Sequence, residues 1–524
     1  KTANDNLNGQ LTVLKSTLES IAISFGEKLT PYVKKATEWL QKMANKFNGL
    51  SSAQKDMIIK VALVAAAIGP CILVFGKMVT SVGKVVGIVG KVGGAFCSNL
   101  PFIGQSRILT NFSGFVKQID TTQEMLADET LDAGVMVQTA GYYAAGDGGG
   151  ALFLISSTET LFPLSNGAYA IIIDDPTNIK AYGAKGDGIA DDTTAFEACM
   201  QTSHIVRLPK TTESYVLGAI TLPEGCSVVG EDTAITAAES TLFTIAHSNT
   251  SIAKLTIDGA NYSAIIMDLE AESRFIYIDD IKAYNADHLL YDVSENYYTN
   301  FYMNRCYGID ITATGVEMHK ARAFIFLDDV TIDIIRTMPN SPAFAFEECR
   351  GMQLRHCEAE GGKTPGHIHM LYNVGFSFKS CVAVWLDRCM ADTLDGIGFE
   401  VANTCEYMYL SQCVASLCGS HAFMLAGSYM TFTNCFANGN VLEEYPLQNV
   451  HGFNIYKDVV MSGCRSTGFT GAGLYVHSTA LVTVSSLMST YCGIGILGEE
   501  SAKGVITGSV ISATTGTQDI PETL

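Results

Sequence analysis

Short runs in which apolar and polar residues alternate recur through the second half of the chain. Strict alternation over four to eight residues predicts a β-strand with one buried face. Each run ends on a small or apolar residue, and a cysteine takes that place in five of the six. The runs are MQLRHC ending at Cys357, VWLDRC at Cys389, MYLSQC at Cys413, MTFTNC at Cys435, VVMSGC at Cys464 and VTVSSL at Leu487.

The runs repeat with a nearly constant spacing. Where no insertion intervenes the period is 22 to 24 residues, and a glycine follows Cys357, Cys389 and Cys464 after nine residues. A fixed period of this size is typical of stacked units that bury their apolar faces only against their neighbours. Because strands and tight glycine turns make up the unit, we expect it to be one coil of a parallel β-helix. Any functional site should then lie along the side of the stack.

Composition supports a folded, reduced protein. Of the 524 residues, 48% are hydrophobic and only 16% are charged, which is not the composition of a disordered chain. Most of the 15 cysteines occupy equivalent coil positions, so we expect an inward ladder of free thiols, not a disulfide framework. Their spacing matches no C-x-x-C metal pattern. No cofactor and no metal site is predicted.

Charge divides the chain into two parts. Residues 1–100 hold 12 lysines and 5 acidic residues, which gives a net charge of +7. The remaining residues carry a net charge of −27, so the whole chain has −20. Such an asymmetry indicates two modules with different surroundings. The acidic part should not bind nucleic acid through its general field. It should also repel an anionic polysaccharide, unless a local basic patch or a divalent cation intervenes.

The first module reads as helical. Residues 7–48 place apolar side chains at helical spacing, and residues 57–75 are almost wholly apolar with Gly69-Pro70 in the middle. The segment ISFGEKLTPYVKKATEWLQKMANKFNGLSSAQKDMIIK resembles phage tail tape-measure proteins, which implies helices housed in a tail tube. The resemblance covers residues 1–92 and stops after Phe96. Any membrane contact should come only through residues 57–96, and residues 93–106 read as a linker.

Residues 107–174 predict a small αβ or β module, and residues 175–205 predict an entry strand and a capping helix. In AYGAKGDGIADDTTAFEACM, Asp192 or Thr193 can cap a helix and Thr194 with Glu197 fits a capping box. A short amphipathic helix is what the open end of a coil stack needs. Turn and cap chemistry explains Asp187, Asp191 and Asp192 better than metal binding does.

The segment YGAKGDGIADDTTAF resembles the opening signature of the pectate-lyase-like right-handed β-helix superfamily, which includes many phage tailspikes. Together with the coils, the resemblance covers about residues 107–515, with the β-helix itself at 206–515. It implies a right-handed β-helix, often a homotrimer, that recognises bacterial surface polysaccharide. It also implies a place in the phage tail after synthesis in bacterial cytoplasm, with other tail components as partners. The sequence ends soon after the last coil, which leaves little room for a domain that would clamp a trimer. The resemblance does not select a reaction.

Two coils carry long insertions, between Cys357 and Gly375 and between Cys435 and Gly452. The coils between them have short turns, so we expect a groove with two walls. Glycoside hydrolysis needs two carboxylates about 5 Å or about 6.5–9.5 Å apart. Glu360 with Asp392, or Asp392 with Asp395, could supply such a pair from neighbouring coil positions. We also assign substrate binding in this groove to Glu358, His421, Asn440, Glu443, Glu444 and Tyr445.

A plainer interpretation of these acids is that turns favour Asp, Asn and Ser for backbone reasons. Three functions therefore remain open for a tailspike-like protein: a polysaccharide hydrolase, a non-enzymatic adhesin, and a tail-assembly protein defined by its tape-measure-like segment. A polysaccharide lyase is a further alternative, although the arginine and paired aspartates of a calcium-dependent lyase are not evident. Aromatic side chains that point outward could stack on sugars, with about half of them packing instead: Tyr297, Tyr298, Tyr302, Tyr307, Tyr407 and Tyr409.

Overall fold

The structure is a computed structural model that describes residues 116–238, 240–334, 341–361, 373–394, 396–439 and 449–513. The predicted helices at 7–48, the apolar stretch at 57–96 and the linker at 93–106 lie outside these residues. Among the described residues, no helix is both long enough and apolar enough to cross a membrane.

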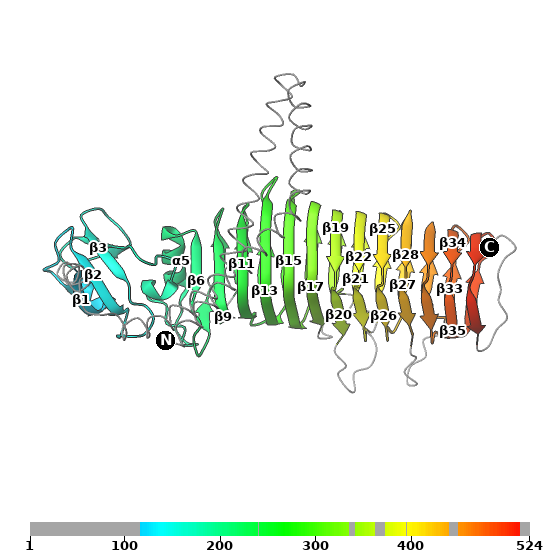
Figure 1. The fold of residues 1–524 in the computed structure, drawn as a ribbon, viewed down its shortest axis with the longest axis horizontal. Helices are drawn as coiled ribbons and strands as arrows, with labels where there is room; N and C mark the ends of the chain where they lie inside the picture. The colour runs from blue at the N-terminus through cyan, green and yellow to red at the C-terminus, as the bar shows by residue number, and fades with distance from the viewer. Residues whose placement is uncertain are drawn as a thin grey trace, which may run out of the picture. The chain divides into compact units, whose positions relative to one another are not determined.

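A small α/β module precedes the coils (Figure 1). One five-stranded sheet, in the order β1-β2-β3-β5-β4, carries a short helix whose first turn is closed by a capping box between Thr121 and Glu124. Parallel pairing joins β1 to β2, and the other pairings in this sheet are antiparallel. The elements are β1 (Val116–Thr121), α4 (Thr122–Ala127), β2 (Met136–Gly141), β3 (Leu152–Ser156), β4 (Phe162–Pro163) and β5 (Tyr169–Ile172).

A right-handed parallel β-helix of about 15 turns follows, as the sequence predicts. One of its faces is a sheet of twelve short parallel strands, each from a successive coil. In chain order these strands are β8 (Ile220–Leu222), β10 (Phe243–Ile245), β12 (Ile265–Met267), β14 (Leu290–Asp292), β16 (Val316–His319), β18 (Phe344–Glu347), β21 (Phe376–Lys379), β24 (Phe399–Val401), β27 (Phe423–Leu425), β30 (Phe453–Ile455), β33 (Ala472–Val476) and β36 (Ile494–Gly498).

The remaining strands form a wider parallel sheet that bends around the other side of each coil. Its first strands are β6 (Ile205–Leu208), β7 (Tyr215–Leu217), β9 (Ser227–Ala237), β11 (Thr250–Asp258), β13 (Arg274–Ala286), β15 (Thr299–Ile311) and β17 (Arg322–Ile334). In each later coil, two shorter strands take the place of one long strand. These pairs are β19 (Arg350–Arg355) and β20 (Glu358–Gly361), β22 (Val382–Asp387) and β23 (Met390–Asp392), β25 (Glu406–Ser411) and β26 (Val414–Ser416), β28 (Met430–Thr433) and β29 (Phe436–Asn438), β31 (Val459–Ser462) and β32 (Arg465–Thr467), β34 (Leu481–Ser485) and β35 (Met488–Cys492), β37 (Lys503–Thr507) and β38 (Val510–Ala513).

The first coil is covered by a short helix, α5 (Thr193–Thr202), which follows a 3-10 turn, η1 (Ile179–Tyr182). Ala195, Phe196 and Cys199 are its buried residues, as its amphipathic pattern predicts. The predicted capping box is wrong, because α5 begins after Asp192 without a side-chain cap. The Asp192 carboxylate instead accepts hydrogen bonds from the Lys185 and Gly186 amides at 2.6 and 3.0 Å, and so stabilises the preceding loop.

A left-handed residue forms the corner between the two strands of each late coil. Arg388, with φ of 54°, separates β22 from β23, and Gln412 and Asn434 hold the same place in the next two coils. The prediction that each alternating run is one strand ending on cysteine is therefore wrong, because a corner of the coil lies just before the cysteine. The strand ends before the left-handed residue, and the cysteine begins the next face of the coil.

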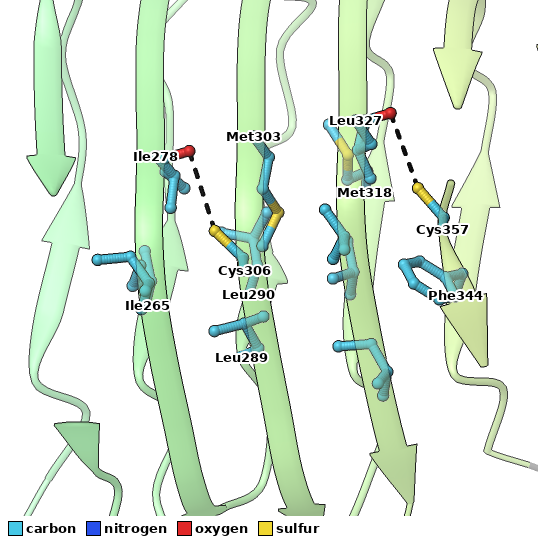
Figure 2. Packing of buried hydrophobic residues seen from close by; sticks show 14 of the residues in the cluster. Ile265, Ile278, Leu289, Leu290, Met303, Cys306, Met318, Leu327, Phe344 and Cys357 are labelled. Atoms are coloured by element: carbon cyan, nitrogen blue, oxygen red, sulfur yellow. Dashed lines mark hydrogen bonds between the residues drawn. The ribbon is translucent and has the colours of Figure 1, made fainter. Parts of the chain in front are cut away.

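The cysteine ladder lies inside these corners. Twelve of the 13 described cysteines are buried and all are free. Most thiols of the ladder donate a hydrogen bond to a carbonyl one coil back, such as Cys306 to Ile278 at 3.9 Å and Cys357 to Leu327 at 3.7 Å (Figure 2). Burial raises the pKa of Cys389 and Cys413 well above the ordinary value, so both remain thiols at neutral pH.

Aromatic rings stack in a second internal ladder. Five phenylalanines from successive strands of the twelve-stranded sheet lie 4.6 to 4.9 Å apart between ring centroids, with planes within 11° of parallel. Each ring is fully buried. Because each ring packs against the ring of the next coil, the ladder connects five coils. Its members are Phe344, Phe376, Phe399, Phe423 and Phe453.

The substitution Phe399→Ala should destabilise the β-helix by about 3–5 kcal/mol, because it removes buried apolar surface and leaves a cavity between two rings. Urea unfolding followed by circular dichroism measures this loss. Val460→Ala, which trims a side chain that is 49% exposed, is the matched control. Equal losses in the two variants would mean that the ring ladder adds nothing beyond ordinary surface packing.

Candidate functional site

Outward-facing positions of the wide sheet form rows along the stack, because successive strands pair in register. One row holds aromatic side chains from five coils and is called the aromatic row here. The register pairs Tyr277 with Tyr302, Tyr302 with Phe326, Phe326 with Gln353, Gln353 with Trp385 and Trp385 with Tyr409. The row thus consists of Tyr277, Tyr302, Phe326, Trp385 and Tyr409, with Gln353 in the middle.

The rings of the aromatic row form two separate stacks. Tyr277, Tyr302 and Phe326 stack with centroid distances of 4.9 and 5.3 Å, and Trp385 stacks on Tyr409 at 5.4 Å. Within a stack the ring faces cover one another. The uncovered faces are at the ends of each stack.

At Gln353 the two stacks face each other across one coil. β17 and β22 are two strand spacings apart, which places Phe326 and Trp385 about 10 Å from each other along the stack. The side chains of Gln353 and Trp385 are both exposed. Aromatic rings on either side and an exposed amide between them are the kinds of group that contact the apolar faces and hydroxyls of a sugar. The sequence analysis missed Phe326, Gln353 and Trp385, although their outward position follows from the alternation in their strands.

The same coil carries two acidic side chains beyond its corner. Glu358 and Glu360 lie two residues apart on β20 and share its outward face. Glu360 is in register with Asp392 on β23. We call Glu358, Glu360 and Asp392 the acidic cluster. All three stand on strands and not in turns, so the preference of turns for aspartate does not explain them.

The spacing of the backbone determines the distances between the positions of these three carboxylates. Neighbouring strands are about 4.8 Å apart, and two residues along a strand span about 6.6 Å. Glu360 and Asp392 are direct neighbours across the ladder, whereas Glu358 and Asp392 are diagonal neighbours about 8 Å apart. The direct pair fits the spacing of retaining glycosidases and the diagonal pair fits that of inverting ones.

The carboxyl of Glu358 has a raised pKa. Partial burial raises the pKa of its carboxyl above the ordinary value, and the charges of Glu360 and Asp392 raise it further. None of the ion pairs among the described residues involves a member of the acidic cluster. A carboxyl whose pKa is raised holds its proton more strongly, as a general acid must.

The row of Glu360 continues in both directions. Asp333 is its partner on β17, and Ser416 is the partner of Asp392 on β26. Ser416 pairs in turn with Asn438, whose side-chain amide donates to the Ser416 hydroxyl at 3.3 Å. Hydrogen-bonding groups therefore line the outer face over five successive coils, two of which carry the acidic cluster.

His421 lies elsewhere on the coil. It precedes β27, and its Nδ1 accepts a hydrogen bond from the His451 amide at 3.0 Å. Its ring stacks on that of His451 with centroids 5.2 Å apart, and burial lowers its pKa. His421 thus belongs to the narrow, twelve-stranded side and not to the face that holds the acidic cluster. Most of the two insertions that should wall the groove lie outside the described residues. The remaining predicted site residues also lie outside them: Asp395, Asn440, Glu443, Glu444 and Tyr445.

The outward tyrosines divide as follows. Tyr298 is fully buried, and its hydroxyl donates to the buried Asp292 at 2.7 Å, so its assignment as an outward residue is wrong. Tyr302 and Tyr409 belong to the aromatic row. The ring of Tyr407 stacks on that of Tyr429, with centroids 5.0 Å apart. Both residues have the left-handed conformation and lie beside the aromatic row.

The aspartates of the entry segment serve their own loop. Asp187 accepts from the Ile189 and Ala190 amides at 3.0 and 2.8 Å, and Asp191 accepts from the Thr193 amide at 2.9 Å. Within the described residues, no group of three or more histidine, cysteine or acidic side chains is placed to hold a metal ion.

No family model matches the chain, and no curated protein matches it. Solved structures to which it is similar include a tailspike of Acinetobacter phage vb_AbaP_AS12, with 12% identity, a TM-score of 0.45 and 76% of each chain covered. They also include the tailspike gp49 of Acinetobacter baumannii phage Fri1, a capsular polysaccharide depolymerase, with 12% identity, a TM-score of 0.39 and again 76% of each chain. An A-module of an Azotobacter vinelandii mannuronan C-5 epimerase has 12% identity and a TM-score of 0.35, and covers 63% of this chain and 99% of its own.

The raised pKa of Glu358 predicts a pH-dependent gain in stability for Glu358→Gln. The folded protein binds this proton more tightly than the unfolded chain does, so the unfavourable contribution is absent at low pH and complete above the raised pKa. The variant should therefore raise the unfolding midpoint more at pH 7 than at pH 4. Glu317→Gln is the control, because it removes a carboxylate that bonds to His319 at 2.8 Å and should show no such gain. A shift that is the same at both pH values would contradict the charge repulsion inferred for Glu358.

Proposed function

We propose that this protein binds a polysaccharide across the aromatic row at Gln353 and hydrolyses it at the acidic cluster. The observation that carries the proposal is that a single coil, Arg350–Gly361, interrupts the aromatic row and also supplies Glu358 and Glu360. A sugar held between Phe326 and Trp385 would lie on the coil that bears the carboxyl of raised pKa.

The proposed roles follow from the electrostatics. Glu358 donates its proton to the oxygen of the leaving sugar, and Asp392 activates the attacking water as general base. Glu360 raises the pKa of Glu358 from two residues away on the same face. The diagonal spacing of about 8 Å between Glu358 and Asp392 favours inversion at the anomeric carbon.

The first test is to incubate the full chain with capsular and secreted polysaccharides from candidate host bacteria. Hydrolysis yields new reducing ends without the ultraviolet absorbance of an unsaturated sugar. Glu358→Gln should lower the rate by about 10²- to 10⁴-fold while binding is retained, because it removes only the general acid. Glu400→Gln, which alters a carboxylate on the narrow sheet, is the control.

Other outcomes of this assay would replace the mechanism. Absorbance from unsaturated sugars would identify a lyase and remove the roles given to Glu358 and Asp392. Retained binding with no cleavage would identify an adhesin. Nuclear magnetic resonance of the first product supplies a further check, since retention of the anomeric configuration would assign the chemistry to the closer pair, Glu360 and Asp392.

Binding has its own test. Trp385→Ala should weaken polysaccharide binding by about three- to tenfold, because it removes one of the two aromatic faces beside Gln353. Affinity electrophoresis in gels with increasing polysaccharide measures the change. Tyr491→Ala, at an aromatic side chain that is 75% exposed and far along the stack, should bind as the unaltered protein does. Equal binding by Trp385→Ala would remove the aromatic row from the site.

A further inference from the structure

Arginines recur at the position where the long strands of the wide sheet begin. Arg274 opens β13 and pairs with Thr299 on β15. Arg322 opens β17 and is in register with Arg350, which opens β19. Two guanidinium groups thus start from backbone positions about 4.8 Å apart, which is unfavourable for like charges unless something of opposite charge lies between them.

These three arginines have no acidic partner, unlike most of the other arginines that the structure describes in the β-helix. Arg305 bonds to Asp279 at 2.6 Å, Arg388 to Asp387 at 3.0 Å, and Arg355 to Asp328. By contrast, the side chains of Arg274, Arg322 and Arg350 make no ion pair and no hydrogen bond with another described residue. Residues 101–524 hold 48 acidic side chains, so an arginine pair without a partner is unusual on this surface.

Arg322 is held in place by an aromatic ring. Its guanidinium carbon lies 3.1 Å from the centroid of the exposed Tyr297 ring. Its Nε atom is buried and has no hydrogen-bond partner among the described residues. A buried donor without an acceptor is costly. The cation–π contact positions the group but supplies no negative charge.

Apolar rings lie beside the pair. Phe324, two residues after Arg322, is 61% exposed in a left-handed conformation, and Phe275 occupies the matching place after Arg274 and is 39% exposed. Gly351 follows Arg350 at this position and bears no side chain. The surface therefore combines paired positive charge with an exposed aromatic face.

We propose that Arg322 and Arg350 bind the carboxylate or sulfate group of an acidic sugar whose ring packs against Phe324. A planar guanidinium binds such oxyanions through two parallel hydrogen bonds. The proposal rests on the proposed function, because Arg350 and Gln353 lie on one strand and would contact the same chain of sugars. It adds that the polysaccharide is anionic, although the net charge of −27 on residues 101–524 opposes such a polymer at long range.

Affinity electrophoresis of the full chain with a polyuronate, and with the same polymer after chemical reduction of its carboxyl groups, tests this proposal. The unaltered protein should bind the polyuronate more tightly than the reduced polymer. Arg322→Gln with Arg350→Gln should weaken binding to the polyuronate by about tenfold or more, because charge-assisted hydrogen bonds are lost. Arg355→Gln is the matched control, since Arg355 is exposed but already bonded to Asp328.

The exposed Arg350→Gln alone gives a second variant that leaves the Arg322–Tyr297 contact in place, and it should show part of the loss. Two results would overturn the arginine site: no binding of the polyuronate by the unaltered protein, or equal binding by the double variant. If the acidic and the reduced polymers bind equally and Trp385→Ala weakens both, the arginine site fails while the proposed function stands. If the host polysaccharides are neither bound nor cleaved, the proposed function itself fails.

Discussion

The parallel register between successive coils is the constraint on which the rest of this structure depends. It places each residue about 4.8 Å from its counterpart in the coils before and after it. Side chains that attract their own kind therefore form ladders, as Phe376, Phe399 and Phe423 do inside the β-helix. Side chains that repel their own kind, such as Glu360 beside Asp392, are brought together by the same geometry.

Corners are the second consequence of stacking. Each coil must turn at the same place, and the backbone does so through a residue in the left-handed conformation, such as Arg388 or Gln412. That conformation is unfavourable for residues with a side chain. It is supported by backbone hydrogen bonds from one corner to the next coil, including Arg388 to Ser411 and Gln412 to Thr433, both at 2.9 Å. The stack thus maintains a local geometry that no single coil would hold.

The period of the alternating runs was enough to predict the β-helix and its inward thiols, because these depend only on which residues recur. The helical cap was predicted separately, from the local sequence of residues 181–200. The corners were not predicted, since Arg388 and Gln412 carry no glycine-like signal. Tyr298 was misplaced because it directly follows the exposed Tyr297, and consecutive residues face opposite sides. The aromatic row could not be recognised either, because Phe326 and Trp385 are distant in sequence and become neighbours of Gln353 only through the register. The pKa of Glu358 likewise depends on Asp392 from the next coil.

One coil departs from the rows that its neighbours form. At residues 350–361 an arginine lies in register with another arginine, an amide replaces an aromatic ring, and Glu360 lies between Asp333 and Asp392. The two arginines and the three acidic side chains repel their neighbours across the ladder, and the amide interrupts the stacked rings, so none of these choices favours stacking. Proteins usually break local rules of stability where a ligand or a reaction requires it. The departures all face outward, where they do not disturb the buried Cys357 and Leu354 of the same coil. The interior of the coil therefore follows the requirements of folding, whereas its surface has the departures that the proposed binding site would explain.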